Sequence, residues 1–184
     1  MASELYEATY SWTDEAELRQ ALTLAPQPCP KVVDIAAGPN VGPGTVVTRQ
    51  APGALYIPLD PEPRHLMLLR QALGARVQPV LGRGSCLPFR ANSLDVVLYH
   101  HGIDDVYETE GREGLRRSLD EAWRVLRPEG VVVASHCQFS YDPATQETSL
   151  DEVEAQLEAL GGEVALRASG DRMDWLVVRK RLRQ

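Results

Sequence analysis

The sequence predicts an α/β fold: a doubly wound, mostly parallel seven-stranded sheet that ends in a C-terminal antiparallel hairpin. From residue 31 onward, apolar runs of strand length alternate with helical patterns, and such alternation is typical of parallel strands joined by crossover connections. The last two apolar runs are separated only by a short Gly-Asp turn, which predicts a hairpin. With 184 residues and 43% apolar content, the chain is long enough for one domain with an ordinary core.

The first 30 residues are predicted to form an N-terminal helical flap beside a main domain spanning 31–184. Thr13 precedes the stretch DEAELRQALTLA, in which the apolar residues fall on one helical face. Three prolines at alternate positions, starting with Pro26, end this helix. We therefore expect the main domain to begin after Pro30.

The next elements are read from strand-like and helical patterns in turn. KVVDIAA is a near-continuous apolar run, as expected of a strand covered on both faces. The segment after it contains so much Gly and Pro that only a short helix, over residues 44–50, is expected before the strand ALYIPLD. Pro63 opens a helix through RHLMLLRQAL, and the strand RVQPVL follows. Pro79 cannot donate to a neighbouring strand, so this third strand is predicted at a sheet edge.

The second half continues the alternation and closes the sheet. LDVVLY is predicted as a buried strand followed by the polar run HHGIDDVYE, and a helix is expected over residues 111–126. The strand VVVAS follows Pro128-Glu129-Gly130. Ser149 and Glu152 form a capping-box pattern that predicts a helix ending at Leu160, and EVALRAS and DWLVVRK are the strands of the hairpin.

Charge and composition argue against several classes of partner. The formal charge of −7 disfavours a surface that follows nucleic-acid phosphates, because such surfaces depend on clustered Lys and Arg. No apolar stretch approaches the length of a membrane span, and the N-terminus lacks the pattern of a secretory signal. Cys29, Cys86 and Cys137 are far apart in the sequence, so no disulfide framework or zinc motif is indicated. We expect a cytoplasmic protein with neither a membrane nor a nucleic acid as partner, and the sequence leaves a homodimer open.

Ligands of doubly wound sheets bind beyond the carboxyl ends of the strands, so the residues that follow each strand are the ones to examine. VVDIAAGPN ends the first strand with Ala36, Ala37 and Gly38, whose side chains are small enough for a ligand to touch the main chain. The alternative interpretation is a tight turn with nothing bound. The motif alone does not decide between the two.

The polar run after the fourth strand offers acid–base chemistry. His101 and Asp105 are four residues apart, so the carboxylate could orient the imidazole as a base. The alternative is that Asp104 and Asp105 cap the following helix while one histidine is simply exposed. Adjacent residues of an extended chain point to opposite sides, which argues against convergence of His100, His101 and the two acids on a metal, and no metal is predicted.

These motifs together resemble a class I S-adenosylmethionine-dependent methyltransferase of the small, single-domain, Rossmann-like kind. The resemblance runs from Lys31 to Arg179 and is carried by VVDIAAGPN, YIPLDPEP, LPFRANSLDVV and LDEAWRVLRPEGVVVAS. The last stretch is the most diagnostic, because RVLRPEG before a β-branched run recurs in this family. The resemblance implies S-adenosylmethionine as the cofactor and a small molecule as the methyl acceptor.

The resemblance also implies roles for individual residues. Asp34 would help to hold the turn and the methionine amino group, and Ala36, Ala37 and Gly38 would contact the amino-acid portion. Asp60 would accept hydrogen bonds from the ribose hydroxyls, since two carboxylate oxygens suit a vicinal diol; otherwise it only begins a turn. Pro61 would lie against the adenine edge, and His100 would lie nearest the transferred methyl group.

Two positions depart from the family pattern. Asn40 stands where many relatives have a third small residue, although Asn still tolerates a positive φ. Arg83 stands where the family has an acid that accepts from the adenine amino group, and a guanidinium has no acceptor to offer. Backbone groups at Gly84, Ser85 or Cys86 could contact the adenine instead, or Arg83 could stack on it.

The sequence therefore predicts a methyltransferase acting on a small molecule, with the catalytic candidates His100, His101 and Asp105 nearest the acceptor. The main alternative is a catalytically inactive binding or scaffold protein of the same fold with a degenerate cofactor pocket, because a fold does not fix a function. A third interpretation is a site for another nucleotide, in which Arg83 faces a phosphate.

Overall fold

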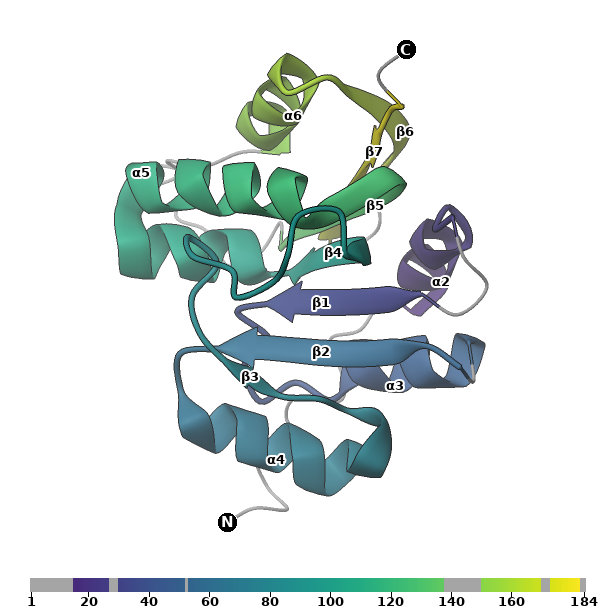
Figure 1. The fold of residues 1–184 in the computed structure, drawn as a ribbon, viewed down its shortest axis with the longest axis vertical. Helices are drawn as coiled ribbons and strands as arrows, with labels where there is room; N and C mark the ends of the chain where they lie inside the picture. The colour runs from purple at the N-terminus through teal and green to yellow at the C-terminus, as the bar shows by residue number, and fades with distance from the viewer. Residues whose placement is uncertain (1–14, 27–29, 52, 138–149, 170–172, 183–184) are drawn as a thin grey trace.

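The structure is a computed structural model that describes residues 15–26, 30–51, 53–137, 150–169 and 173–182. One seven-stranded sheet has the order β3-β2-β1-β4-β5-β7-β6 (Figure 1). Its strands are β1 (Lys31–Ile35), β2 (Leu55–Asp60), β3 (Val80–Leu81), β4 (Leu94–His100), β5 (Leu126–Cys137), β6 (Gly162–Ser169) and β7 (Met173–Lys180). The pairs from β3 to β5 are parallel, and β7 runs antiparallel to both β5 and β6. The predicted fold class, including the C-terminal hairpin, is confirmed.

Helices cover both faces of this sheet (Figure 1). They are α2 (Glu15–Thr23), α3 (Gly42–Gln50), α4 (Pro63–Leu73), α5 (Gly102–Val125) and α6 (Leu150–Ala159), with the short 3₁₀ helix η2 (Gly74–Arg76) after α4. Side chains of α5 and α6 share one apolar core with the sheet, while those of α2 and α3 share the other. Each described helix is too short or too polar to cross a membrane.

The described part of the predicted N-terminal flap belongs to the main core. Leu18 and Ala21 of α2 are completely buried and pack in the same cluster as Val46 and Val47 of α3. Two apolar side chains one helical turn apart give α2 a single buried face. Residues 1–14, Ser149 and the hairpin turn at 170–172 lie outside the described residues.

The third strand lies at the sheet edge, as Pro79 predicts, but it is shorter than expected. Only Val80 and Leu81 pair with β2, and Val77 forms a single isolated bridge with Tyr56. Pro79 lacks an N–H between these two contacts, so the ladder is interrupted there. The strand predicted over residues 76–81 is therefore reduced to its last two residues.

The helix predicted over residues 111–126 begins much earlier, at Gly102, because the polar run after β4 is itself helical. Asp104 and Asp105 lie in its first turn, where acids are favourable, and Ile103 and Val106 bury one face. Gly111 has a non-helical backbone, with φ 69° and ψ −179°, and divides α5 into two segments. Figure 1 shows these segments as two adjacent rows of helix beside the carboxyl end of β4.

The winding of the sheet reverses between β1 and β4, and a tight contact joins these strands at their carboxyl ends. A Cβ atom on Gly102 would lie 2.1 Å from the carbonyl oxygen of Ile35, so only glycine fits there. His101, just before it, has a left-handed backbone with φ 63°. The start of α5 is therefore held against the end of β1, at the edge where ligands of such sheets bind.

We predict that Gly102→Ala destabilises the fold by about 3 kcal/mol, because the new methyl group meets fixed backbone rather than a movable side chain. Helix propensity alone predicts the opposite sign, a gain of up to about 1 kcal/mol. Gly82→Ala is the control, since its Cβ would make only an ordinary 3.4 Å contact with Leu59. Urea unfolding of both variants measures the difference, and equal stabilities would contradict the close contact.

Candidate functional site

A cleft of about 360 Å³ opens at the carboxyl ends of β1, β2 and β3. Four segments form its walls: the loop after β1, the end of β2 with the start of α4, the loop after β3, and the first segment of α5. The lining residues are Ala36, Gly38, Pro39, Leu59, Asp60, Pro61, Glu62, His65, Gly82, Arg83, Gly84, Asp105, Val106, Thr109 and Glu110. The structure thus brings six of the predicted site residues into one cleft: Ala36, Gly38, Asp60, Pro61, Gly84 and Asp105.

The loop after β1 leaves room for a ligand at Gly38. Ala36 and Gly38 both have left-handed backbones, with φ 54° and 56°. A Cβ atom on Gly38 would meet no atom within 4 Å, so the space beside this backbone is open. Ala37 between them is different: its N–H donates to the carbonyl of Leu59, and its methyl group packs with α3 and α4. The structure places Ala37 in this packing rather than in the cleft wall.

The two residues that depart from the family pattern do not fill the cleft. The side chain of Asn40 turns back along its own loop, where Oδ1 accepts a hydrogen bond from the N–H of Gly42 at 2.9 Å. Arg83 lies at the cleft wall and is exposed to solvent. The first loop and the loop after β3 therefore leave the cleft open.

Asp60 is the most heavily bonded side chain of the cleft. Its Oδ2 accepts from the N–H of Gly38 at 2.9 Å, and its Oδ1 accepts from the N–H of Glu62 at 2.8 Å. Nδ1 of His65 lies 3.1 Å from the same Oδ1. A carboxylate has about four acceptor positions, so Asp60 has room for one further donor unless a protein donor is displaced. This geometry fits one ribose hydroxyl directly and the predicted second one only after His65 or a backbone group moves.

Asp34 is a buried acid behind the first loop. The Tyr56 hydroxyl donates to its Oδ2 at 2.5 Å, while Oδ1 has no hydrogen-bond partner among the described residues. Burial raises the pKa of Asp34 to about 7, although the hydrogen bonds from Tyr56 and from the backbone of His100 oppose that shift. An acid with an unpartnered oxygen and a pKa near neutrality is well suited to receive a cationic donor.

His100 is buried against the neighbouring strands instead of lining the cleft. Its ring lies 4.7 Å from that of His101 in an edge-on arrangement and 6.1 Å from that of Trp175. Burial, with a smaller contribution from His101, lowers the pKa of His100 to about 3. His100 is therefore neutral at physiological pH and is a weak base. Its Nε2 and the indole Nε1 of Trp175 have no hydrogen-bond partner in the described part of the chain.

The predicted pair of His101 and Asp105 is not formed, since the two side chains share no hydrogen bond. These residues are linked only through the backbone, where the N–H of Asp105 donates to the carbonyl of His101 at 3.5 Å. Burial, together with the charges of Glu108, Asp104 and Asp60, raises the pKa of Asp105 to about 6, while His65 opposes the shift. Asp105 thus belongs electrostatically to the cleft. The catalytic roles of His101 and Asp105 stay predictions.

Two cleft residues, His65 and Glu110, were missed by the sequence reasoning. His65 is in the first turn of α4 and reaches back to the acid that ends β2, so its position after Pro63 was the available signal. Glu110 precedes the break in α5, and its Oε2 accepts from the hydroxyl of Ser85. No sequence signal indicated Glu110, because residues 100–108 were not expected to be helical.

Metal coordination finds no support in the described ranges, which contain no group of three or more His, Cys, Asp or Glu side chains able to hold an ion.

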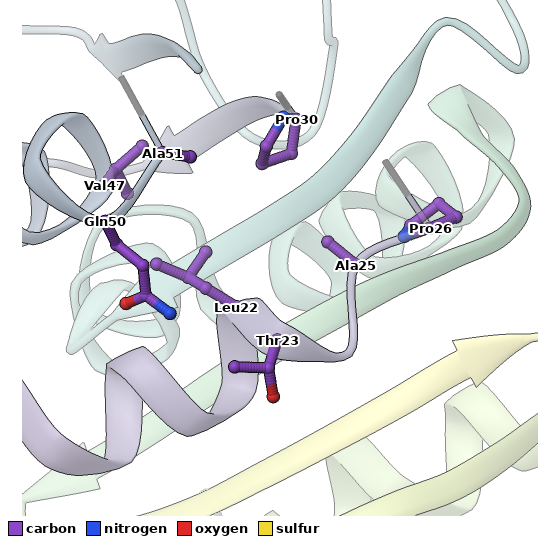
Figure 2. A pocket seen from close by; sticks show the side chains of 8 residues that line it. All are labelled: Leu22, Thr23, Ala25, Pro26, Pro30, Val47, Gln50 and Ala51. Carbon is purple, nitrogen blue, oxygen red and sulfur yellow. The ribbon is translucent and has the colours of Figure 1, made fainter. Parts of the chain in front are cut away.

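A second cleft, of about 280 Å³, lies between α2 and α3 on the side of the sheet where β1 begins (Figure 2). Leu22, Thr23, Ala25 and Pro26 come from the end of α2, and Val47, Gln50 and Ala51 from the end of α3. None of the residues that line it is titratable. This second cleft therefore offers no acid–base group.

The parallel sheet with helices on both faces makes the chain a Rossmann-like protein, and its cleft lies at the edge where such sheets bind their ligands. The methyltransferase domain family matches residues 33–134, which is more than half of the chain. The chain therefore belongs to the methyltransferase domain family, and the family predicted from the sequence motifs is confirmed.

Individual relatives agree with this assignment. A ubiquinone/menaquinone biosynthesis C-methyltransferase UbiE from Cereibacter sphaeroides is 34% identical over 115 residues, which cover 58% of this chain and 42% of that protein. The chain thus spans less than half the length of this curated relative. A SAM-dependent methyltransferase from Aquifex aeolicus has the same fold, with a TM-score of 0.73 and 15% identity over 97% of this chain and 98% of the other.

The same fold also occurs in the [4+2]-cyclase SpnF, with a TM-score of 0.70 and 12% identity over 91% of this chain and 82% of the other. Likeness at this level of identity shows the fold alone. The function of the cleft has to be argued from its own residues.

We predict that Asp34→Asn raises the free energy of unfolding at pH 8 by at most about 4 kcal/mol. The folded-state pKa of Asp34 is raised, so the cost of burying its charge is fully present above pH 7 and disappears as the pH falls toward 4. Urea unfolding at several pH values measures the difference between the variant and the wild type.

The matched control is Tyr56→Phe, which removes the donor to Asp34 and should destabilise the protein at pH 8. A stability difference between Asp34→Asn and wild type that stays constant from pH 8 to pH 4 would show that Asp34 is not the titrating group.

Proposed function

We propose that this chain is an S-adenosylmethionine-dependent methyltransferase that acts on a small molecule. The observation that carries the proposal is the cleft itself, which is open beside Gly38 and bounded by the carboxylate of Asp60. Its place at the carboxyl ends of β1 and β2 is the one at which parallel sheets bind nucleosides. The family supplies the identity of the cofactor.

The charge of the cleft supports a cationic ligand. Four carboxylate side chains line it, against one arginine and one histidine: Asp60, Glu62, Asp105 and Glu110 face the same space as Arg83 and His65. S-adenosylmethionine carries a sulfonium, an ammonium and two ribose hydroxyls, all of which are attracted by carboxylates. A dinucleotide or triphosphate carries several negative charges and would be repelled. This balance favours the methyl donor over a phosphate-bearing ligand held by Arg83.

Individual residues can hold the parts of this cofactor. The unpartnered oxygen of Asp34 suits the ammonium group, whose charge would draw the pKa of Asp34 back down. The space beside Gly38 is open for the amino-acid portion, and Asp60 would accept a ribose hydroxyl. Pro61 and Gly84 complete the wall in which the base would lie.

Bound S-adenosylmethionine supplies an electrophilic methyl group, whose bond to sulfur breaks as the bond to the acceptor atom forms. The protein has to align the acceptor and, for a protonated acceptor, to remove one proton. Asp105, ionised above a pH of about 6, and His101 are the candidates to take up that proton. His100 serves better as a neutral hydrogen-bonding group, because its pKa is too low for a base.

The acceptor is proposed to be a small molecule, and a quinone precursor is the first class to test, since the curated relative is named for quinone biosynthesis. The net charge of −7 argues against a nucleic-acid partner. The three scattered cysteines are consistent with a reducing, cytoplasmic location. The alternative, a scaffold with a degenerate pocket, is disfavoured by the open cleft, because Arg83 and Asn40 leave it unfilled.

We predict that Asp60→Asn weakens binding of S-adenosylhomocysteine by about 10- to 100-fold, the usual loss when a charged hydrogen-bond acceptor becomes neutral. The matched control is Glu62→Gln, which neutralises an exposed acid two residues after Asp60. It should change the affinity less than about threefold. Calorimetric titration of the wild type and both variants gives the three affinities.

The absence of binding heat for the wild-type protein at millimolar S-adenosylhomocysteine would favour the scaffold. A rise in melting temperature with NAD or ATP, but not with S-adenosylhomocysteine, would instead support the phosphate-binding interpretation of Arg83.

A further inference from the structure

We propose that Glu110 is the residue that selects adenine in this cleft, by accepting a hydrogen bond from the 6-amino group, and that Ser85 orients it. The proposal rests on the proposed function, because it assumes that an adenosine occupies the cleft. It assigns a specificity-determining role to a side chain outside the sequence motifs of the family.

Glu110 is placed where a base could meet it. It lines the same cleft as Gly84, in the loop after β3, and Pro61, after β2. These two residues have little or no side-chain polarity with which to contact a base. Arg83 is polar, but it has only donors and cannot accept from an amino group. Apart from Asp60, the carboxylates of the cleft are Glu62, at the start of α4, and Asp105 and Glu110, both on the first segment of α5.

Among these acids, Glu110 alone is held by the loop after β3. The hydroxyl of Ser85 donates to its Oε2, which fixes the carboxylate across the cleft wall and leaves Oε1 for a ligand. Glu62 is exposed and caps α4, where it accepts from the N–H of Arg64. Asp105 interacts mainly with the acids beside it and with Asp60 and His65, at the ribose acid. Glu110 is thus the carboxylate nearest to the segment that would carry the base.

The backbone around Glu110 also fixes its position. Gly111, with φ 69°, ends the first segment of α5 directly after it. A Cβ atom on Gly114 would lie 2.2 Å from the Cβ of Glu110, so a glycine is required for the chain to turn there. Burial raises the pKa of Tyr99, and the negative charge of Glu110 makes a smaller contribution in the same direction. The carboxylate of Glu110 therefore interacts electrostatically with a buried residue of β4.

The carboxylate of Glu110 is available to a ligand. Within the described ranges, Glu110 forms no ion pair, and Ser85 occupies only one of its acceptor positions. The 6-amino group of adenine can donate two hydrogen bonds. A purine with hydrogen at this position has no donor there. A preorganised carboxylate should therefore favour adenine over an otherwise identical purine, because the unmatched ligand leaves the acceptor unsatisfied.

The test compares two ligands on matched variants. S-adenosylhomocysteine and its 6-deamino analogue, which lacks only the amino group, are titrated by calorimetry into wild type, Glu110→Met, Glu110→Gln and the exposed control Glu108→Gln. We expect wild type and Glu108→Gln to prefer the adenine ligand by about 10- to 100-fold. Glu110→Met should bind the two ligands with about equal affinity. The preference of Glu110→Gln should lie between those of Glu110→Met and wild type. The 7-deaza analogue, which keeps the amino group, should bind each protein as S-adenosylhomocysteine does.

The outcomes separate this inference from the proposed function. If wild type binds S-adenosylhomocysteine and Glu110→Met keeps the full preference, the role of Glu110 is refuted while the methyltransferase proposal stands. If wild type binds neither ligand, the proposed function itself fails. If Glu110→Met does not fold, as judged by circular dichroism, the isosteric Glu110→Gln decides, and an unchanged preference in that variant overturns the inference.

Discussion

The carboxylate of Asp60 is the interaction on which the rest of the cleft depends. It accepts from the backbone of Gly38 in the first loop, from the backbone of Glu62 at the start of α4, and it lies beside the ring of His65. The first loop and the start of α4, which are separate in the sequence, are therefore held together by one buried side chain. Hydrogen bonds to a charged acceptor are stronger than neutral ones, so this arrangement keeps the loop open without a ligand. The ligand then has to share an acceptor that the fold already uses.

Much of the architecture could be predicted from local patterns, while the site depended on contacts between distant residues. Apolar runs and proline positions identified the sheet, its hairpin and the edge position of β3. Asp60 was found because it ends a strand, and Gly38 because it lies in the loop just after one. The first segment of α5 was missed, because Gly102 and two adjacent acids are typical of a loop; tertiary contact with Ile35 and burial of Ile103 make it helical. Glu110 reaches the cleft only through that packing.

The loop that contains Arg83 looks different in the sequence and in the folded protein. In the sequence it marks the loss of an acid from the loop after β3. In the structure the same loop holds an acid through Ser85, and that acid comes from α5, 25 residues further along the chain. A cleft wall built from two segments can carry a charge on either of them. The interaction with a ligand depends on where the charge lies in space and not on which segment carries it. The wall as a whole stays acidic, which a phosphate-binding site would not be.

Buried polar atoms near the carboxyl edge of the sheet carry an energetic cost. Oδ1 of Asp34, Nε2 of His100 and Nε1 of Trp175 have no hydrogen-bond partner among the described residues. Each such atom costs about 1–3 kcal/mol when it is left unsatisfied, and apolar replacements would remove the cost. A protein that used this fold only to contact partners would gain stability by losing these groups. Asp34 lies behind the first loop, so an ammonium group placed beside its Oδ1 would satisfy that oxygen. His100 and Trp175 are buried outside the cleft lining, so a ligand in the cleft does not account for their unpartnered nitrogens.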